Sequence, residues 1–160
     1  MRILVISDSH GQYGVLRELL KKEKYDVIYH CGDLEGGEDI IPGLAGCNMV
    51  AVKGNCDYTY SLPSETVLKV GNHKIFMTHG HGYRVKYDLL RLRLAAEAAG
   101  CDFALFGHTH MPVLTCEGGV TIMNPGSISY PRQDGKAYTY GILEVDKNGY
   151  ITPQIKAFAD

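Results

Sequence analysis

The sequence lacks the features that mark membrane, exported and disordered proteins. It has no apolar run long enough to span a bilayer. Its first residues, MRILVIS, lack the charged leader, long apolar stretch and small-residue cleavage site of an export signal. It also has no low-complexity tract and no run of like charges. We therefore expect a folded protein with no membrane association.

Paired cysteine motifs are also missing. The chain has 5 cysteines, an odd number, and no CxxC pair. This argues against both a disulfide framework and a zinc-thiolate site. The expected location is the reducing environment of the cytoplasm.

The charge balance is close to neutral, with a formal net charge of -2. Non-specific electrostatic binding to nucleic acid is therefore not expected, although a local positive site could still exist. The length of 160 residues fits one domain with a single substantial core, so we expect one domain over residues 1–160.

Apolar runs rich in β-branched residues alternate with two helical patterns. Strands are expected at residues 3–6, 27–29, 49–52, 66–70, 74–77, 103–106, 113–114, 120–123, 138–145 and 150–155. Helices are expected near residues 15–20 and over 87–99, and residues 36–46 form a helix or a loop. The first strands are separated by connections and should pair in parallel. So many strands with so few helices indicate an α/β protein with two packed sheets flanked by helices.

Short polar clusters follow several of these strands. They are Asp8-Ser9-His10, Gly32-Asp33, Gly54-Asn55, His79 and Gly107-His108-Thr109-His110. Side chains two apart on a strand point the same way, which would let Asp8 and His10 reach one metal, and likewise His108 and His110. Because α/β sheets collect ligands at the carboxyl ends of strands, all these residues should meet at one edge. Carboxylate, amide and imidazole groups in this number can hold two divalent ions.

Each cluster also has a purely structural interpretation. Asp8 could cap the helix that follows, and His108-Thr109-His110 could be a solvated loop. Asp33 and Asn55, each after a glycine, could simply form turns. The structural interpretation must explain every cluster at once, however, so a metal site is favoured.

The ordered motifs resemble those of the calcineurin-like metallophosphoesterase superfamily. The chain length, the Gly54-Asn55-Cys56-Asp57 block and Asn124-Pro125-Gly126-Ser127 are similar to the small phosphodiesterases of the YfcE type. The resemblance covers essentially the whole chain. It implies a four-layer α/β/β/α sandwich with two mixed sheets face to face, and self-association into a dimer or tetramer.

The resemblance also implies two sets of metal ligands that share a bridging Asp33. Asp8, Asp33, His10 and His110 would hold the first ion, and Asp33, Asn55, His79 and His108 the second. The ligand set has no thiolate and suits manganese, with iron, nickel, cobalt or zinc also possible. A hydroxide bridging two such ions can attack phosphorus in line. The implied activity is hydrolysis of small phosphate esters, most simply phosphodiesters.

One position departs from the superfamily pattern. Many members carry a histidine after the asparagine, where it is thought to protonate the leaving oxygen, and this chain has Cys56. A thiol is a poorer acid for this purpose, so good leaving groups should be favoured. His81 is the nearest other candidate acid. Alternatively, His81 could form a hydrogen bond to a metal ligand, and Cys56 could be a packed residue without a chemical role.

A non-catalytic scaffold on the same fold is the alternative function. The retromer subunit that resembles this superfamily is such a scaffold, and its Gly-Asp and Gly-Asn positions are altered. Here Asp33 and Asn55 both match the hydrolase pattern, which favours an enzyme. A nuclease is disfavoured because the chain has no basic face or added DNA-binding segment.

Overall fold

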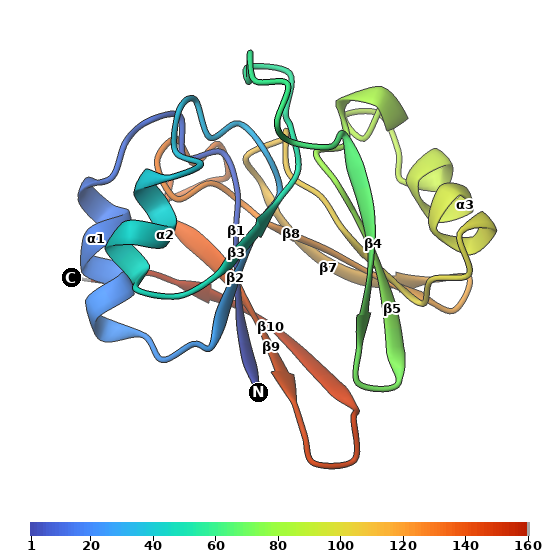
Figure 1. The fold of residues 1–160 in the computed structure, drawn as a ribbon. Coiled ribbons are helices and arrows are strands. Elements are labelled where there is room, and N and C mark those ends of the chain that lie inside the picture. Colours follow the sequence, from blue (N-terminus) through green and yellow to red (C-terminus); the bar gives the residue numbers. More distant parts are fainter. Residues whose placement is uncertain (160) are drawn as a thin grey trace.

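The computed structural model describes residues 1–159, which form two β-sheets between helices (Figure 1). The strands are β1 (Arg2–Ile6), β2 (Val27–His30), β3 (Met49–Ala51), β4 (Glu65–Val70), β5 (His73–Thr78), β6 (Phe103–Leu105), β7 (Pro112–Glu117), β8 (Val120–Pro125), β9 (Thr139–Val145) and β10 (Ile151–Ala157). The helices are α1 (Gly14–Lys22), α2 (Ile40–Ala45) and α3 (Leu90–Ala98), with a short 3₁₀ helix at His81–Tyr83. The 3₁₀ helix was not expected from the sequence.

Both sheets are mixed and five-stranded. The first has the order β10-β9-β1-β2-β3 and the second β4-β5-β6-β8-β7. β1, β2 and β3 pair in parallel, as predicted, because helical connections return the chain to the same end of the sheet. The strand β9 then pairs antiparallel with β1 and joins the amino-terminal sheet.

Alternating burial along the strands produces three apolar layers. Ile3 and Val5 face the second sheet, whereas Leu4 and Ile6 face α1 and α2. A third cluster, which includes Leu92 of α3, fills the space between that helix and the second sheet. Strands buried on both faces explain why the first run is continuously apolar. The result is the four-layer α/β/β/α sandwich that the resemblance implied, with helices on the two outer sides (Figure 1).

The helix α3 is shorter than the sequence pattern suggested. It begins at Leu90, where the Asp88 carboxylate accepts the backbone N–H at 3.0 Å, rather than at residue 87. It ends at Ala98, one residue before the predicted end. Gly100 has a φ of 69° and Cys101 donates its N–H to the carbonyl of Ala96 at 2.9 Å, which is a glycine-type helix stop.

The carboxyl ends of β1, β2, β3, β5 and β6 lie at the same end of the molecule, the upper one in Figure 1. The chain segments that follow these strands therefore meet above the contact between the two sheets. Among residues 1–159, none of the helices has the length and apolar character needed to cross a membrane.

Candidate metal centre

The predicted ligands lie in segments that follow five different strands. Asp8 and His10 come after β1, Asp33 after β2, Asn55 after β3, His79 directly after β5, and His108 and His110 after β6. The Asp8 and Asp33 segments run side by side. Asp8 donates its N–H to the Gly32 carbonyl at 3.0 Å, and His10 donates to the Asp33 carbonyl at 2.9 Å. The fold thus brings all seven predicted ligands to one end of the sandwich.

The backbone at these positions differs from the sequence-based expectation. Asp8 and His10 do not alternate along a strand, because β1 ends at Ile6, and His108 and His110 lie beyond the end of β6. Instead, residues with positive φ at the site are Asp8 (55°), His10 (46°), Asp33 (59°), His108 (69°) and His110 (58°). Such a conformation costs an L residue roughly 1 kcal/mol or more, and it concentrates at functional sites. The side chains converge through these strained turns.

Asp8 also does not cap a helix. The residue before α1 is Tyr13, and no side chain caps that helix end. The Asp8 side chain is fully buried and points into the ligand cluster instead. The capping interpretation is therefore wrong.

Asp8, His10 and His110 form the first close group. Oδ1 of Asp8 lies 3.2 Å from Nε2 of His110 and 3.9 Å from Nε2 of His10. The two Nε2 atoms of His10 and His110 are 3.2 Å apart. One ligand atom from each side chain is within 4.8 Å of the others, which fits a single cation.

Asp8, Asp33 and His79 form a second close group on the other side of Asp8. Nε2 of His79 lies 3.2 Å from Oδ2 of Asp33 and 3.9 Å from Oδ1 of Asp8. The Oδ1 atom of Asn55 is 3.0 Å from the same nitrogen. In this geometry Asp8 belongs to both groups, and the bridging role of Asp33 stays a prediction.

The outer nitrogens of three imidazoles are already engaged. Nδ1 of His79 donates to the Cys31 carbonyl at 2.7 Å, and Nδ1 of His110 donates to the Tyr130 carbonyl at 2.6 Å. Nδ1 of His10 lies 2.8 Å from the Glu35 carboxylate. Carbonyl and carboxylate oxygens only accept, so each Nδ1 carries a proton and each Nε2 of the neutral ring is free to bind a metal.

The buried Asp8 carboxylate is a further sign of a cation. Its Oδ1 atom is inaccessible to solvent and has no hydrogen-bond partner among residues 1–159, although its Oδ2 accepts the His108 N–H at 3.1 Å. An unpaired, buried carboxylate oxygen is costly unless it coordinates an ion. The donor set, with oxygen and imidazole ligands around this atom, fits divalent transition metals.

Charges within the site support each other even without metal. Burial alone would raise the pKa of Asp8, but the imidazoles of His110 and His79 outweigh it and hold that pKa below its usual range. The pKa of Asp33 is also lowered, since its contact with His79 outweighs burial. In return, the two carboxylates raise the pKa of His79 although burial opposes this. Both carboxylates are thus kept ionised and ready to bind a cation.

His108 lies farther from the cluster than the other histidines predicted as ligands. Its ring centroid is 5.1 Å from that of His79, and His108 does not belong to either close group. Partial burial, together with the positive charge of His79, lowers the pKa of His108 to about 4. A neutral imidazole is the form that binds metal.

The two candidate acids lie on different sides of the site. His81 is exposed in the 3₁₀ helix, with its ring centroid 5.5 Å from that of His79, and its pKa is lowered chiefly by desolvation. Cys56 lies near His10 and Glu35. Desolvation and the charge of Asp33 raise the pKa of Cys56 to about 11. Its sulfur accepts a hydrogen bond from Nδ2 of Asn55 at 3.4 Å.

Asp57 is an organising residue whose role the sequence did not reveal. Its Oδ2 atom accepts the N–H groups of Asp33 and Gly54, each at 2.8 Å, and its Oδ1 accepts that of Glu35 at 2.7 Å. One buried carboxylate thereby ties the β2 and β3 ligand segments together. Its place in the Gly54-Asn55-Cys56-Asp57 block was the only available signal.

The Asn124-Pro125-Gly126-Ser127 segment borders the site. Nδ2 of Asn124 donates to the Gly107 carbonyl at 2.9 Å, and Oγ of Ser127 donates to the Asp8 carbonyl at 2.9 Å. These contacts hold the ends of β1 and β6 together. At Gly107, any Cβ would collide with Oγ of Ser7 and crowd the Asp8 carboxylate, so only glycine allows this approach.

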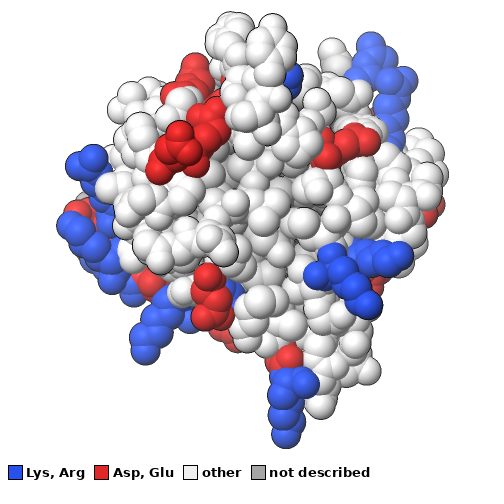
Figure 2. Space-filling view, viewed as in Figure 1, with Lys and Arg blue, Asp and Glu red and all other residues white. Residues whose placement is uncertain are grey.

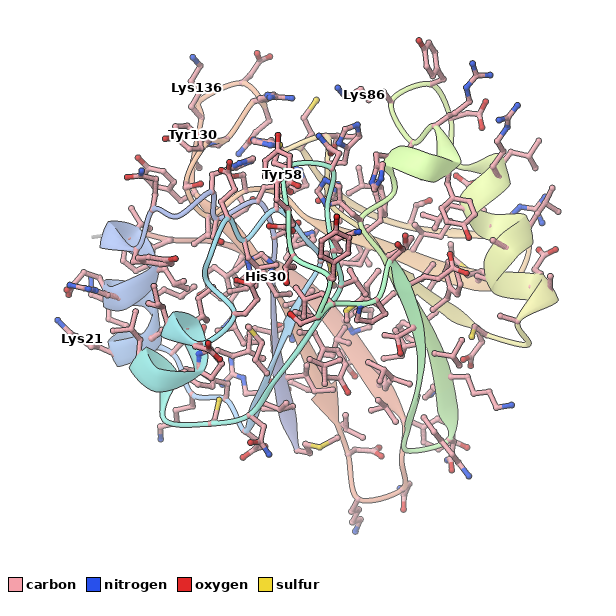
Figure 3. The ribbon with its side chains drawn as sticks, turned by 45° about the horizontal axis from the view of Figure 1, so that its top comes forward. Lys21, His30, Tyr58, Lys86, Tyr130 and Lys136 are labelled. Atoms are coloured by element: carbon pink, nitrogen blue, oxygen red, sulfur yellow. The ribbon has the colours of Figure 1, made fainter. Side chains whose placement is uncertain are left out.

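Figure 3 shows Tyr58, Tyr130 and Lys86 around the end of the molecule that carries the site. The ring of Tyr130 packs edge-on against that of His10, with centroids 5.6 Å apart. Tyr58 is 93% exposed. Acidic side chains gather at the upper left of the surface, whereas basic side chains are spread around its rim (Figure 2).

Comparisons with known proteins identify the family. The family model of the calcineurin-like phosphoesterase superfamily domain matches residues 1–148. The phosphodiesterase YfcE of Escherichia coli K12 is 33% identical over 172 aligned positions, which cover 91% of this chain and 89% of YfcE.

Two solved structures are similar throughout. A predicted phosphoesterase from Streptococcus pneumoniae TIGR4 superposes with a TM-score of 0.82 and 31% identity, covering 98% of this chain and 88% of that one. Vps29 from Entamoeba histolytica, solved in complex with Zn²⁺, has a TM-score of 0.78 and 26% identity, covering 99% of this chain and 100% of Vps29. The chain therefore belongs to the calcineurin-like phosphoesterase superfamily, a family of metal-dependent hydrolases.

Proposed function

We propose that this protein hydrolyses small phosphodiesters with two divalent metal ions. The observation that carries the proposal is the buried Asp8 Oδ1 atom, which has no hydrogen-bond partner among residues 1–159 and lies within 3.9 Å of the Nε2 atoms of His10, His79 and His110. Three imidazole nitrogens around one buried, unpaired carboxylate oxygen are a donor set that suits divalent cations.

The proposed ligands divide between the two ions as the family resemblance implies. Asp8, Asp33, His10 and His110 hold one ion, and Asp33, Asn55, His79 and His108 hold the other, with Mn²⁺ as the expected metal. When bound, such ions make a water nucleophile available at neutral pH and neutralise the charge of phosphoryl oxygens. Two dications outweigh the charges of Asp8 and Asp33, so the site attracts an anionic ester.

A preference for diesters rests on the relative that carries that name, the phosphodiesterase YfcE. The candidate acids add a preference for good leaving groups. With a pKa of about 11, the Cys56 thiol is a reluctant proton donor, and the lowered pKa of His81 leaves its ring mostly neutral at pH 7. An ester whose leaving group needs no proton is therefore the better substrate.

The decisive experiment measures hydrolysis of bis(p-nitrophenyl) phosphate by the purified protein in the presence of Mn²⁺. Asp33→Asn should lose nearly all activity, because the amide keeps the shape of this buried side chain but removes the negative charge that would bind the metal. Asp134→Asn, at an exposed position, is the matched control and should keep wild-type activity. No bound metal and no hydrolysis of any mono- or diester would refute the proposal.

A scaffold function is the second candidate, and the structural similarity to Vps29 favours it. Metal binding cannot separate the two, because a Vps29 structure was itself solved with Zn²⁺. Turnover can. A protein that binds two equivalents of metal but hydrolyses no phosphoester would be a scaffold.

We further place the enzyme in the cytoplasm as a self-associating protein. All 5 cysteines are free thiols, which suits a reducing environment. Self-association into a dimer or tetramer is testable by light scattering of the purified chain. A molar mass of one chain, 17.6 kDa, would contradict it.

A further inference from the structure

Glu35 lies next to the site and was not among the predicted site residues. Its Oε2 atom is 2.8 Å from Nδ1 of His10, while Nε2 of the same ring faces His110 at 3.2 Å. The His10 ring therefore stands between a carboxylate and the proposed metal position. Its side chain is only 14% exposed, compared with 41% for Glu35.

The backbone around Glu35 is held so that this contact forms. Glu35 itself has a φ of 50°, in the left-handed region, and donates its N–H to Asp57 at 2.7 Å. The preceding residue, Leu34, accepts the N–H of Gly11 at 3.1 Å, which locks the segment against the one that carries His10. A strained glutamate that is fixed from both sides indicates a built contact rather than a chance surface pair.

His10 differs in this respect from the other two oriented histidines. Nδ1 of His79 and Nδ1 of His110 donate to backbone carbonyls, which are neutral. Nδ1 of His10 donates to a carboxylate, and this negative charge makes the opposite nitrogen a stronger electron donor to a metal. The charge also favours a cation on the far side of the ring.

We propose that Glu35 is a positioning residue that orients His10 and tightens the metal site formed by Asp8, His10 and His110. This inference rests on the proposed metal-dependent function. It concerns one of the two proposed metal positions, since Glu35 forms no hydrogen bond or ion pair with Asn55 or His79 among the described residues. The second position should therefore be insensitive to Glu35.

Binding of Mn²⁺ and Co²⁺ to the purified full chain tests the proposal, with a chromophoric chelator as competitor. Glu35→Gln keeps the size and an acceptor oxygen but removes the charge, and Glu35→Ala removes the acceptor as well. Glu38→Gln is the matched control, because Glu38 is a carboxylate of the same segment that is not hydrogen-bonded to a site histidine in residues 1–159. We expect affinity to fall roughly 10- to 100-fold in Glu35→Ala, less in Glu35→Gln, and not at all in Glu38→Gln.

Double variants assign the effect to one site. In an Asn55→Ala background, which retains the His10 and His110 position, Glu35→Gln should weaken the remaining ion. In a His110→Ala background, which retains the other position, it should have no effect. Equal weakening in both backgrounds, or none in either, would overturn the inference. A wild-type protein that binds no metal would instead refute the proposed function itself.

The absorption spectrum of the Co²⁺ protein gives an independent result. Glu35→Gln should shift the d–d bands, because the His10 ligand is altered. The wild-type protein should show no cobalt–thiolate band. Cys56 lies within 4.8 Å of His10 and Glu35, so the three could form a metal site of their own. A thiolate band that disappears in both Cys56→Ser and Glu35→Gln would make Glu35 a direct ligand and overturn its positioning role.

Discussion

The Nε2 atoms of His10 and His110 lie 3.2 Å apart at the centre of the site. Both rings use their Nδ1–H for other acceptors, Glu35 and the Tyr130 carbonyl, so in the neutral protein two lone pairs face each other. Together with the unpaired Oδ1 of Asp8, these two nitrogens give three donor atoms that a single cation could satisfy at once.

Metal removal should therefore lower stability. At a free Mn²⁺ concentration of about 100 times Kd, binding adds roughly 2.7 kcal/mol to the free energy of unfolding. For a chain of this length, this corresponds to a rise in Tm of roughly 5 to 10 °C, measured by calorimetry with and without chelator. Asp33→Asn should show a much smaller response. Equal Tm values in chelator and in Mn²⁺ for the wild type would contradict a preformed metal site.

Loss of the Asp57 carboxylate should destabilise the metal-free protein. Asp57→Ala leaves the N–H groups of Asp33, Gly54 and Glu35 without their acceptor, and each buried, unpaired donor costs roughly 1 to 3 kcal/mol. We expect a loss of about 3 kcal/mol in urea unfolding with chelator present. Asp134→Ala serves as the exposed control. A variant as stable as the wild type would show that water replaces these hydrogen bonds at no cost.

Restoring an imidazole at position 56 should broaden the range of substrates. Because general acid catalysis contributes typically 10²–10⁴-fold, we expect Cys56→His to raise kcat/KM for alkyl phosphodiesters by at least roughly 10-fold. Hydrolysis of bis(p-nitrophenyl) phosphate should change little, since its leaving group needs no proton. Cys56→Ser controls for loss of the thiol alone. If the dependence of rate on leaving-group pKa is the same in all three proteins, position 56 has no part in proton transfer.

His30 should make the metal-free protein sensitive to mild acid. Burial lowers the pKa of His30 to about 4, and Nδ1 already accepts the Gly32 N–H, so protonation would break that bond. Because the folded pKa lies below the unfolded value of about 6.5, the stability contributed by neutral His30 is present above pH 6.5 and is lost as the pH falls toward 4. The loss should reach roughly 3 kcal/mol.

The variant His30→Gln keeps a donor and an acceptor but does not titrate, so it isolates this contribution. Urea unfolding at several pH values, with chelator present, should give wild-type and variant curves that converge as the pH falls from 6.5 to 4. Parallel curves across that window would show that His30 does not titrate as the structure predicts. His79 acts in the opposite direction: its raised pKa gives stability below pH 6.5 that is lost as the pH rises through the folded pKa.

Much of the fold could be predicted from local patterns. The continuous run at residues 3–6 and the strands expected at residues 66–70 and 74–77 follow from the pattern of apolar residues, and the structure confirms them. The start of α3 was wrong because a side chain of the preceding turn, Asp88, fixes it. No local pattern determined that β9 would return to pair with β1.

By itself, the sequence determined which chemical groups the site contains. Carboxylates, an amide and imidazoles follow strand after strand, and residue type and order along the chain are enough to indicate a metal site and a family. Their order could not show the geometry that makes the site work. The positive φ of Asp8 and Asp33, the Asp57 bridge and the pairing of Glu35 with His10 depend on segments that are distant in sequence. Parallel pairing of β1, β2 and β3 within the first sheet brings these segments together, because contacts between residues distant in sequence are set by tertiary structure and not by local propensity.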